Sequence, residues 1–177
     1  GSGDDPWEAV VRGAAQRTAA EMVDAAILLH MPVARVGETA PLALQTLAEG
    51  GRKDGMVLDL SALWAGPYCG ALLAEAGHEV VKVESPTRPD PTPLHTPRLD
   101  ARLNGRKRRL SMALDTDQLR ALIGDARVLI TSGRPHALAK LGLDEASVFA
   151  INPGLLWIAI TAHGWGGEAA MRVGFGD

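Results

Sequence analysis

The chain has 177 residues, of which 46% are hydrophobic and 22% charged, a composition typical of one globular domain and not of a disordered chain. The net charge of −3 argues against a nucleic-acid partner, and the single cysteine, Cys69, excludes an internal disulfide and a multi-cysteine zinc site. No apolar run reaches the roughly 18 residues of a membrane span, and the polar start is unlike a signal peptide. We therefore expect a cytoplasmic protein without a membrane partner.

The first 50 residues predict a helical segment that ends in a linker. Residues 6–29 carry apolar side chains at helical spacing, and Thr18 with Glu21 forms a capping-box pattern that would begin a second helix. The Gly-rich stretch 49–55 predicts the linker. The chain has no initial methionine and stops soon after a second Gly-rich stretch, so we expect a truncated piece of a longer protein.

Residues 51–177 predict an α/β domain with a Rossmann-like, doubly wound parallel sheet. Short apolar runs predict strands at 56–60, 79–84, 110–114, 126–130 and 155–160. Helical stretches lie between them at 66–76, 116–123, 135–141 and 144–151, with Asp115 and Asp144 as caps. This alternation is typical of parallel strands joined by right-handed crossovers. Five prolines within residues 85–105 predict a long loop without regular structure.

In such sheets a ligand binds beyond the carboxyl ends of the strands. The loop 61–70 is the most informative, because Gly66 allows close backbone approach and the helix that follows offers free N–H groups to an anion. Trp64 adds a flat apolar face, although it is equally consistent with this loop that Trp64 and Tyr68 pack at the rim and Gly66 only turns the chain. Glu84 lies where a dinucleotide site needs an acid, but Gly66 and Gly70 do not form the G-x-G-x-x-G pattern, so NAD binding is disfavoured.

Arg102 and the run 106–109 form a basic cluster, which either contacts the phosphates of a small ligand or is a solvated surface. The histidines show no metal-ligand spacing, so no metal site is predicted. His163 follows the last strand as a proton shuttle or a structural histidine, and Cys69 is more typical of a core residue than of a nucleophile.

A series of short motifs in residues 56–177 resembles the N-terminal half of the family III coenzyme A (CoA) transferases, the CaiB/BaiF family. That family includes formyl-CoA transferase, carnitine CoA-transferase and α-methylacyl-CoA racemase. The motifs occur in the family's order and spacing at residues 57–61, 65–67, 72–84, 104–107, 111–115, 126–130, 134–135, 138–143, 151–155 and 158–161.

The resemblance implies a CoA-binding domain that takes acyl-CoA and carboxylates as substrates and holds no tightly bound cofactor. Trp64 falls on the residue that lines pantetheine and adenine, and Lys140 falls near the CoA phosphates. Arg88 lies close enough to substitute for a basic residue that is Ser85 here. The full set of implied CoA contacts is Trp64, Ala65, Arg88, Leu114, Ser132, Gly133, Lys140, Thr161 and Ala162.

The resemblance also implies transfer through a nucleophilic aspartate. Asp177 corresponds to a family segment that precedes this residue, so we expect the nucleophile outside the chain and keep Asp177 as the weaker candidate. The racemase branch uses a histidine that would fall near residues 175–176, where none is present, and this favours a transferase.

Residues 17–21 and 31–33 resemble a segment found late in family members, which implies a chain built from two such modules. Family members form interlocked dimers, so a homodimer or a companion chain is the expected partner. A catalytically inactive CoA-binding or interaction module with the same fold remains the alternative.

Overall fold

The computed structural model describes residues 5–38 and 55–174, and the chain divides into two compact units. One unit comprises Gly50–Thr161, and the other comprises Gly1–Glu49 together with Ala162–Asp177. The last segment therefore groups with the N-terminal residues, whereas the sequence grouped it with the sheet; the domain division at residue 50 stays a prediction. Each unit is described by itself.

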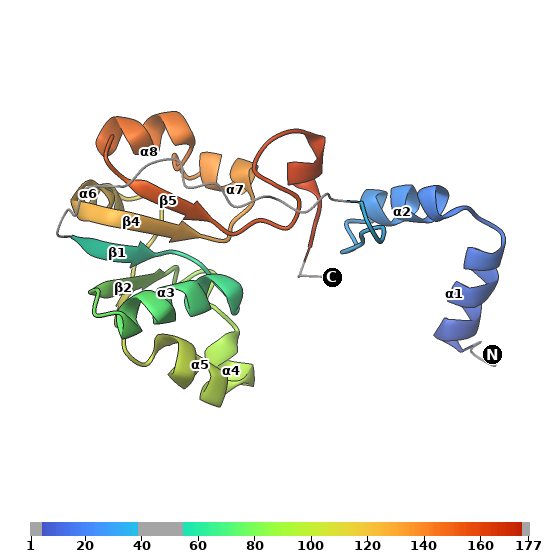
Figure 1. Cartoon of the computed structure of the whole chain (residues 1–177), viewed down its shortest axis with the longest axis horizontal. Helices are drawn as coiled ribbons and strands as arrows, with labels where there is room; N and C mark the ends of the chain where they lie inside the picture. Colours follow the sequence, from blue (N-terminus) through green and yellow to red (C-terminus); the bar gives the residue numbers. More distant parts are fainter. Residues whose placement is uncertain (1–4, 39–54, 175–177) are drawn as a thin grey trace. The chain divides into compact units, whose positions relative to one another are not determined.

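The larger unit is built on a parallel sheet of five strands (Figure 1). Its order is β3-β2-β1-β4-β5, and every adjacent pair is parallel. This confirms the predicted Rossmann-like α/β fold. The strands are β1 Met56–Asp59, β2 Val80–Glu84, β3 Arg108–Ser111, β4 Ala126–Thr131 and β5 Leu156–Ala159.

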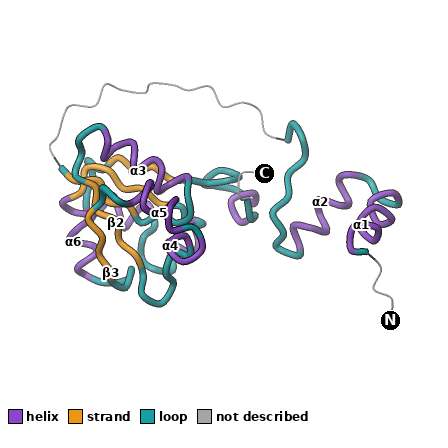
Figure 2. The backbone as a smooth tube through the Cα atoms, turned by 90° about the horizontal axis from the view of Figure 1, so that it is seen from below, coloured by secondary structure: helices purple, strands orange, loops and turns teal. Residues whose placement is uncertain are grey.

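Helices cover both faces of this sheet. The chain leaves β1 for β2 and β3 on one side and then returns to β4, so right-handed crossovers place the later helices on the opposite face. Accordingly α3 and α5 lie on one face and α6 and α8 on the other, as Figure 1 shows. Figure 2 shows α3 and α5 side by side. The helices are α3 Ala65–Glu75, α4 Thr92–His95, α5 Pro97–Asn104, α6 Asp117–Asp125, α7 Pro135–Ala139 and α8 Glu145–Ile151.

The core lies along the three inner strands, which are buried on both faces and are therefore almost continuously apolar. Leu58 on β1 is fully buried between Val81 on β2 and Leu129 on β4. Leu119 and Ile123 of α6 are also fully buried. The edge strand β3 instead exposes arginines, which discourages pairing with another sheet.

The prediction that residues 85–105 hold no regular structure is wrong, because the segment contains α4 and α5. Pro93 and Pro97 lie in the first turns of these helices, where a missing N–H is tolerated. The backbone N–H of Thr96 donates to the Thr92 carbonyl at 2.8 Å, so α4 completes its single turn.

The predicted bounds of the third strand and the predicted N-cap of the helix after it are also wrong. β3 occupies residues 108–111, with one more ladder bond from the Met112 N–H to the Glu84 carbonyl, so Leu114 lies in the turn after the strand and not at its end. The cap of α6 is Thr116, whose hydroxyl accepts the Leu119 N–H at 3.3 Å, and not Asp115. Asp144 caps α8 as predicted.

The other unit begins with two short helices, α1 Pro6–Ala15 and α2 Ala19–Leu28. The predicted break is confirmed, since Thr18 and Glu21 form a complete capping box at the start of α2. The predicted linker at 49–55 lies outside the described residues except for Gly55. No helix in the described ranges combines the length and the apolar character that a bilayer crossing requires.

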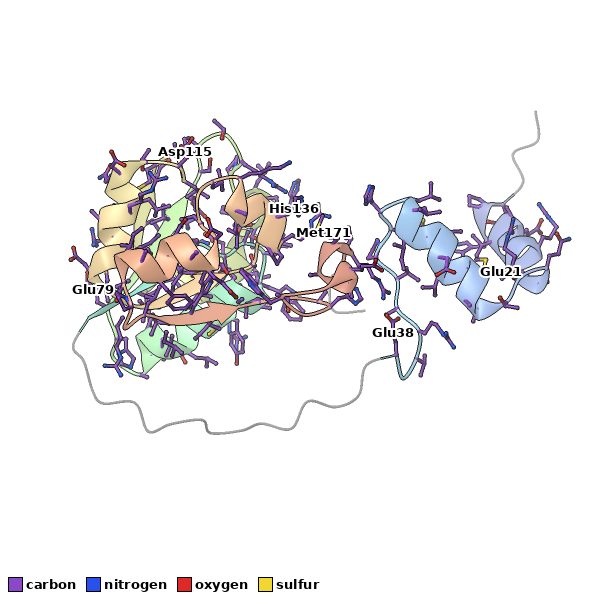
Figure 3. The ribbon with its side chains drawn as sticks, turned by 90° about the horizontal axis from the view of Figure 1, so that it is seen from above. Glu21, Glu38, Glu79, Asp115, His136 and Met171 are labelled. Atoms are coloured by element: carbon purple, nitrogen blue, oxygen red, sulfur yellow. The ribbon has the colours of Figure 1, made fainter. Side chains whose placement is uncertain are left out.

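Farther along the chain, this unit contains the short 3-10 helix η1, Glu168–Met171. Directly after it, Arg172 forms an ion pair with Glu38 and donates to the Val33 carbonyl at 2.7 Å. Figure 3 labels Glu38 and Met171 in this unit. The contact therefore ties the C-terminal segment to the segment after α2.

Candidate functional site

The topological switch point of the sheet lies between the neighbouring strands β1 and β4. The chain turns from β1 toward β2 but from β4 toward β5, so the loops that follow these two strands diverge, as they do at ligand sites of doubly wound sheets. The backbone N–H of Ala62 donates to the Ser132 hydroxyl oxygen at 2.9 Å across this point. The predicted loop 61–70 and the predicted site residue Ser132 therefore meet here.

The turn from β1 into α3 has a conformation that its residues restrict tightly. Gly66 is buried against Ser61, and a side chain at Gly66 would collide with the Ser61 side chain, so only glycine fits. Leu63 adopts a positive φ of 68°, which is unusual for a leucine. Trp64 precedes the first turn of α3 with 63% of its surface exposed, so its ring can contact a ligand.

A buried lysine fixes this turn from beneath. Lys107 Nζ donates to Asp59 Oδ2 at 2.7 Å, to Asn104 Oδ1 at 2.9 Å and to the Pro67 carbonyl at 2.7 Å. Burial lowers the pKa of Lys107, and Asp59 acts in the opposite direction. Because all three donor positions are used, the ammonium form suits this enclosed position. A side chain at Gly70 would meet Lys107 Nζ at 2.8 Å, so the helix needs glycine there.

The basic cluster mostly serves the fold. The sequence left two alternatives for Lys107, a contact with a ligand phosphate or a solvated surface position. Both are wrong, because Lys107 is buried and donates to groups of the protein. Arg109 pairs with Asp100 at 2.8 Å and with Glu84 at 3.2 Å, and Arg108 pairs with Glu79 at 3.6 Å. Glu84, the acid that a dinucleotide site would use, is therefore engaged by Arg109.

Two further side chains hold the same turn and were not found from the sequence. Lys82 is fully buried and donates from Nζ to the Ser61 carbonyl at 2.6 Å. Asp90 accepts the Leu63 N–H on Oδ2 at 3.0 Å. No local pattern reveals either contact, because the partners lie 21 and 27 residues apart.

The remaining predicted residues lie along the carboxyl side of the sheet. Arg88 is exposed in the turn after β2, and Leu114 is half-buried in the turn after β3. Gly133 follows Ser132 and lies against Leu138 of α7. Lys140 and Thr161 are exposed after α7 and β5. In Figure 3 the label His136, a residue that follows β4, marks this side of the sheet. The label Glu79, a residue that precedes β2, marks the opposite end of the strands.

The structure brings together the segments of Trp64, Ala65 and Ser132, and it distributes the others along the same edge. Ala162 belongs to the other unit, and Asp177 lies outside the described residues. Contacts of all these residues with CoA stay predictions.

Reactive groups at this edge are few. Cys69 on α3 is half-buried, and burial together with the nearby Asp59 raises the pKa of its thiol, which disfavours the reactive thiolate. Within residues 5–38 and 55–174, no group of three or more histidine, cysteine or acidic side chains could hold a metal ion. The edge is therefore equipped to bind a ligand by backbone, aromatic and cationic groups.

Solved structures support the same fold. A hypothetical protein from Mycobacterium tuberculosis superimposes with a TM-score of 0.62 at 30% identity, covering 72% of this chain and 38% of that protein. A CaiB/BaiF family protein from Brucella suis gives a TM-score of 0.59 at 33% identity, covering 69% of this chain and 36% of that protein.

Curated relatives include the succinyl-CoA–D-citramalate CoA-transferase of Chloroflexus aurantiacus, 34% identical over 70% of this chain and 34% of that protein. The alpha and beta subunits of succinyl-CoA–L-malate CoA-transferase from the same organism are 32% and 31% identical, each over 67% of this chain and over 29% and 32% of their own lengths. The chain thus spans about a third of the length of these relatives. Residues 53–177 match the model of the family described as "CoA-transferase family III", which confirms the resemblance of the motifs. The chain therefore belongs to that family.

Proposed function

We propose that this chain is the CoA-binding part of an enzyme that moves CoA between carboxylic acids. The observation that carries the proposal is the switch point between β1 and β4, where the Ser132 hydroxyl fixes the Ala62 N–H and Trp64 is exposed. Membership of family III supports CoA thioesters as the substrates.

Each part of the CoA molecule has a suited partner along this edge. The exposed ring of Trp64 offers a stacking surface for adenine or for the pantetheine chain. The first turn of α3 carries the positive end of the helix dipole, and Arg88 and Lys140 supply exposed cations for phosphates. Ser132 and Gly133 border the pantetheine in this arrangement.

The chemistry we propose is nucleophilic acyl transfer. An aspartate carboxylate attacks the thioester carbonyl, the carbon–sulfur bond breaks, and a mixed anhydride forms as the CoA thiolate leaves. The thiolate then attacks the aspartyl carbonyl and releases the donor acid, leaving an aspartyl-CoA thioester. The acceptor carboxylate then attacks the aspartyl-CoA thioester, which forms a second anhydride and releases the thiolate. The thiolate attacks the acceptor carbonyl of this anhydride, which gives the new acyl-CoA and frees the aspartate. The covalent intermediates split one difficult step into easier ones. Asp177, the candidate for this aspartate within the chain, is not described.

Binding of CoA is tested by isothermal titration calorimetry with CoA and with NAD. We expect CoA to bind and NAD not to bind, because the loop after β1 lacks the dinucleotide glycine pattern. Trp64→Ala should weaken CoA binding by about fivefold or more, since stacking of a base on an aromatic ring contributes ~1–3 kcal/mol. Trp7→Ala removes an exposed tryptophan from the other unit and is the matched control. Absence of heat with CoA at millimolar concentration would contradict the proposal.

Activity is tested by thioester exchange between labelled carboxylic acids on the full-length gene product. Exchange is expected for a transferase; CoA binding without exchange would support the catalytically inactive module, and exchange of the proton next to the thioester would support the racemase.

We also propose that the active protein is a homodimer or pairs with a companion chain. Support comes from two relatives that are named as the alpha and beta subunits of one transferase. Light scattering of the purified full-length gene product, alone and with a companion chain, should show a dimeric mass; a monomer that catalyses exchange would contradict this.

A further inference from the structure

The backbone of the turn after β1 is held by side chains from both neighbouring strands. Ala62 and Leu63 are consecutive, yet the Ala62 N–H donates to Ser132 after β4 and the Leu63 N–H donates to Asp90 after β2. Since β1 lies between β2 and β4 in the sheet, the turn is fixed from its two sides. Trp64 follows directly, so its placement depends on both contacts.

The two carboxylate oxygens of Asp90 have different partners. Oδ1 accepts the Thr92 N–H at 2.9 Å and the Thr92 hydroxyl at 2.6 Å, which stabilises the loop that carries Asp90. Oδ2 accepts the Leu63 N–H at 3.0 Å, which reaches across to the other loop. One carboxylate oxygen is therefore enough for the contacts within the loop of Asp90, and the second oxygen makes the contact with the other loop.

The contact also explains the conformation of Leu63. A leucine at a φ of 68° pays a steric cost that nearby structure must offset. Fixing the Leu63 N–H by a charged acceptor opposes relaxation of the turn, because a hydrogen bond to a charged group is stronger than a neutral one. The Leu63 conformation in turn sets the direction in which the chain enters α3.

We propose that Asp90 is a positioning residue for CoA binding: its Oδ2 holds Leu63 so that Trp64 and the first turn of α3 face the ligand. This inference rests on the proposed function. Asp90 itself need not touch CoA, and it acts through the backbone of the turn after β1.

The test compares Asp90→Asn with the native chain. An asparagine has one acceptor oxygen, so keeping Thr92 places its NH₂ group against the Leu63 N–H, and a donor then faces a donor. We expect hydrogen exchange of the Leu63 amide to accelerate about tenfold and CoA affinity to fall about tenfold. Exchange is followed by mass spectrometry on a peptide spanning residues 61–66, and affinity by calorimetry.

Two variants serve as controls. Asp125→Asn makes the same change of charge at the opposite end of the sheet, just before β4, and should leave both readouts within twofold. Thr92→Ser keeps the hydroxyl that bonds to Asp90 Oδ1 at 2.6 Å and to the Leu63 carbonyl at 3.3 Å and removes only a methyl group, so it should retain CoA affinity within twofold.

The outcomes separate this inference from the proposed function. If the native chain binds no CoA, the proposed function fails, while faster Leu63 exchange in Asp90→Asn still supports the positioning contact. If the native chain binds CoA and Asp90→Asn binds it equally well, the positioning role is overturned. An equal loss of affinity in Thr92→Ser, which keeps the hydrogen bonds of Thr92, would assign the effect to packing of the loop and would also overturn it.

Discussion

Lys107 shows how a single buried charge organises the turn that precedes α3. Its side chain and that of Asp59 are both fully buried. Removing each charge from water therefore costs on the order of several kcal/mol of desolvation free energy. The direct ion pair and the bonds to Asn104 and Pro67 offset this cost. A pair of this kind adds little net stability but penalises any arrangement that separates its members, which suits a turn that must keep one shape.

Removing one member of the pair should therefore be much worse than removing both. We expect Lys107→Met to lower the free energy of unfolding by about 3–5 kcal/mol, because Asp59 is left buried without its counter-charge. The double variant Lys107→Met, Asp59→Asn should lose clearly less than the sum of the two single variants. Urea denaturation followed by circular dichroism measures all three.

Arg106→Met is the matched control for the lysine, since Arg106 is the exposed neighbour of Lys107 in the chain. It should change the free energy of unfolding by no more than about 0.5 kcal/mol. Additive losses in the double variant would show that Lys107 and Asp59 are not coupled in the way the contacts indicate.

Gly70 is kept in the interior of α3 although glycine weakens a helix. A Cβ at this position would lie 2.8 Å from Lys107 Nζ and 2.9 Å from Asp59 Oδ2. Gly70→Ala should therefore lower the free energy of unfolding by about 1–3 kcal/mol, as overpacking does. Gly124→Ala in α6 meets only an ordinary contact at 3.7 Å and should instead add about 0.5–1 kcal/mol. Thermal unfolding of both variants measures the contrast, and a gain at Gly70 would contradict the close packing.

At the scale of elements, the start of a helix is the feature that the sequence predicts best and also misleads most. The Thr18 box and the Asp144 cap were identified because a side chain and its backbone partner lie only three residues apart. The five prolines of 85–105 predict a segment without regular structure, and this prediction is wrong. Pro93 and Pro97 lie in first turns, so the same residue type begins helices that it would interrupt farther along.

The ion pair between Glu38 and Arg172 gives its unit a pH-dependent contact. The Arg172 guanidinium, followed by the Arg35 backbone N–H, lowers the pKa of Glu38 from 4.5 to about 2. A carboxyl whose pKa is lower in the folded state stabilises it above the unfolded value, and this stabilisation is lost as the pH falls from about 4.5 to about 2. Carbon-13 NMR of the Glu38 carboxyl should show a midpoint near 2.

The controls for this titration are two variants. Arg172→Gln should return the midpoint toward 4.5, because the guanidinium is the main cause of the shift. Glu168→Gln, in η1 of the same unit, should leave it unchanged. A midpoint at 4.5 in the native chain would show that Glu38 and Arg172 are not paired in solution.

At the scale of the whole molecule, the fold was predictable because alternating strands and helices leave few topologies. The same rule predicts a ligand at the carboxyl edge of the sheet, and the loop 61–70 does contact Ser132 there. The residues that fix this edge were not predictable. Asp90 lies 27 residues from its partner Leu63 in the sequence, and Lys107 lies 48 residues from Asp59. Such contacts form only when the complete sheet assembles.

A ligand that binds only the folded sheet unit must stabilise it by mass action. At a CoA concentration 100 times the dissociation constant, the stabilisation is about 2.7 kcal/mol. For a chain of this size that raises the melting temperature by roughly 5–10 °C. Scanning calorimetry with CoA should show this increase, and NAD at the same concentration should not.

Hydrogen exchange locates the stabilisation within the molecule. Protection by CoA should concentrate at residues 61–67 and 132–133, because these two segments meet at the switch point between β1 and β4, where doubly wound sheets bind their ligands. Helices α1 and α2 belong to the other unit and should exchange at the same rate with and without CoA. Protection confined to α1 and α2, or a rise in melting temperature without protection at 61–67, would place the ligand elsewhere and would contradict a binding site at the carboxyl edge of the sheet.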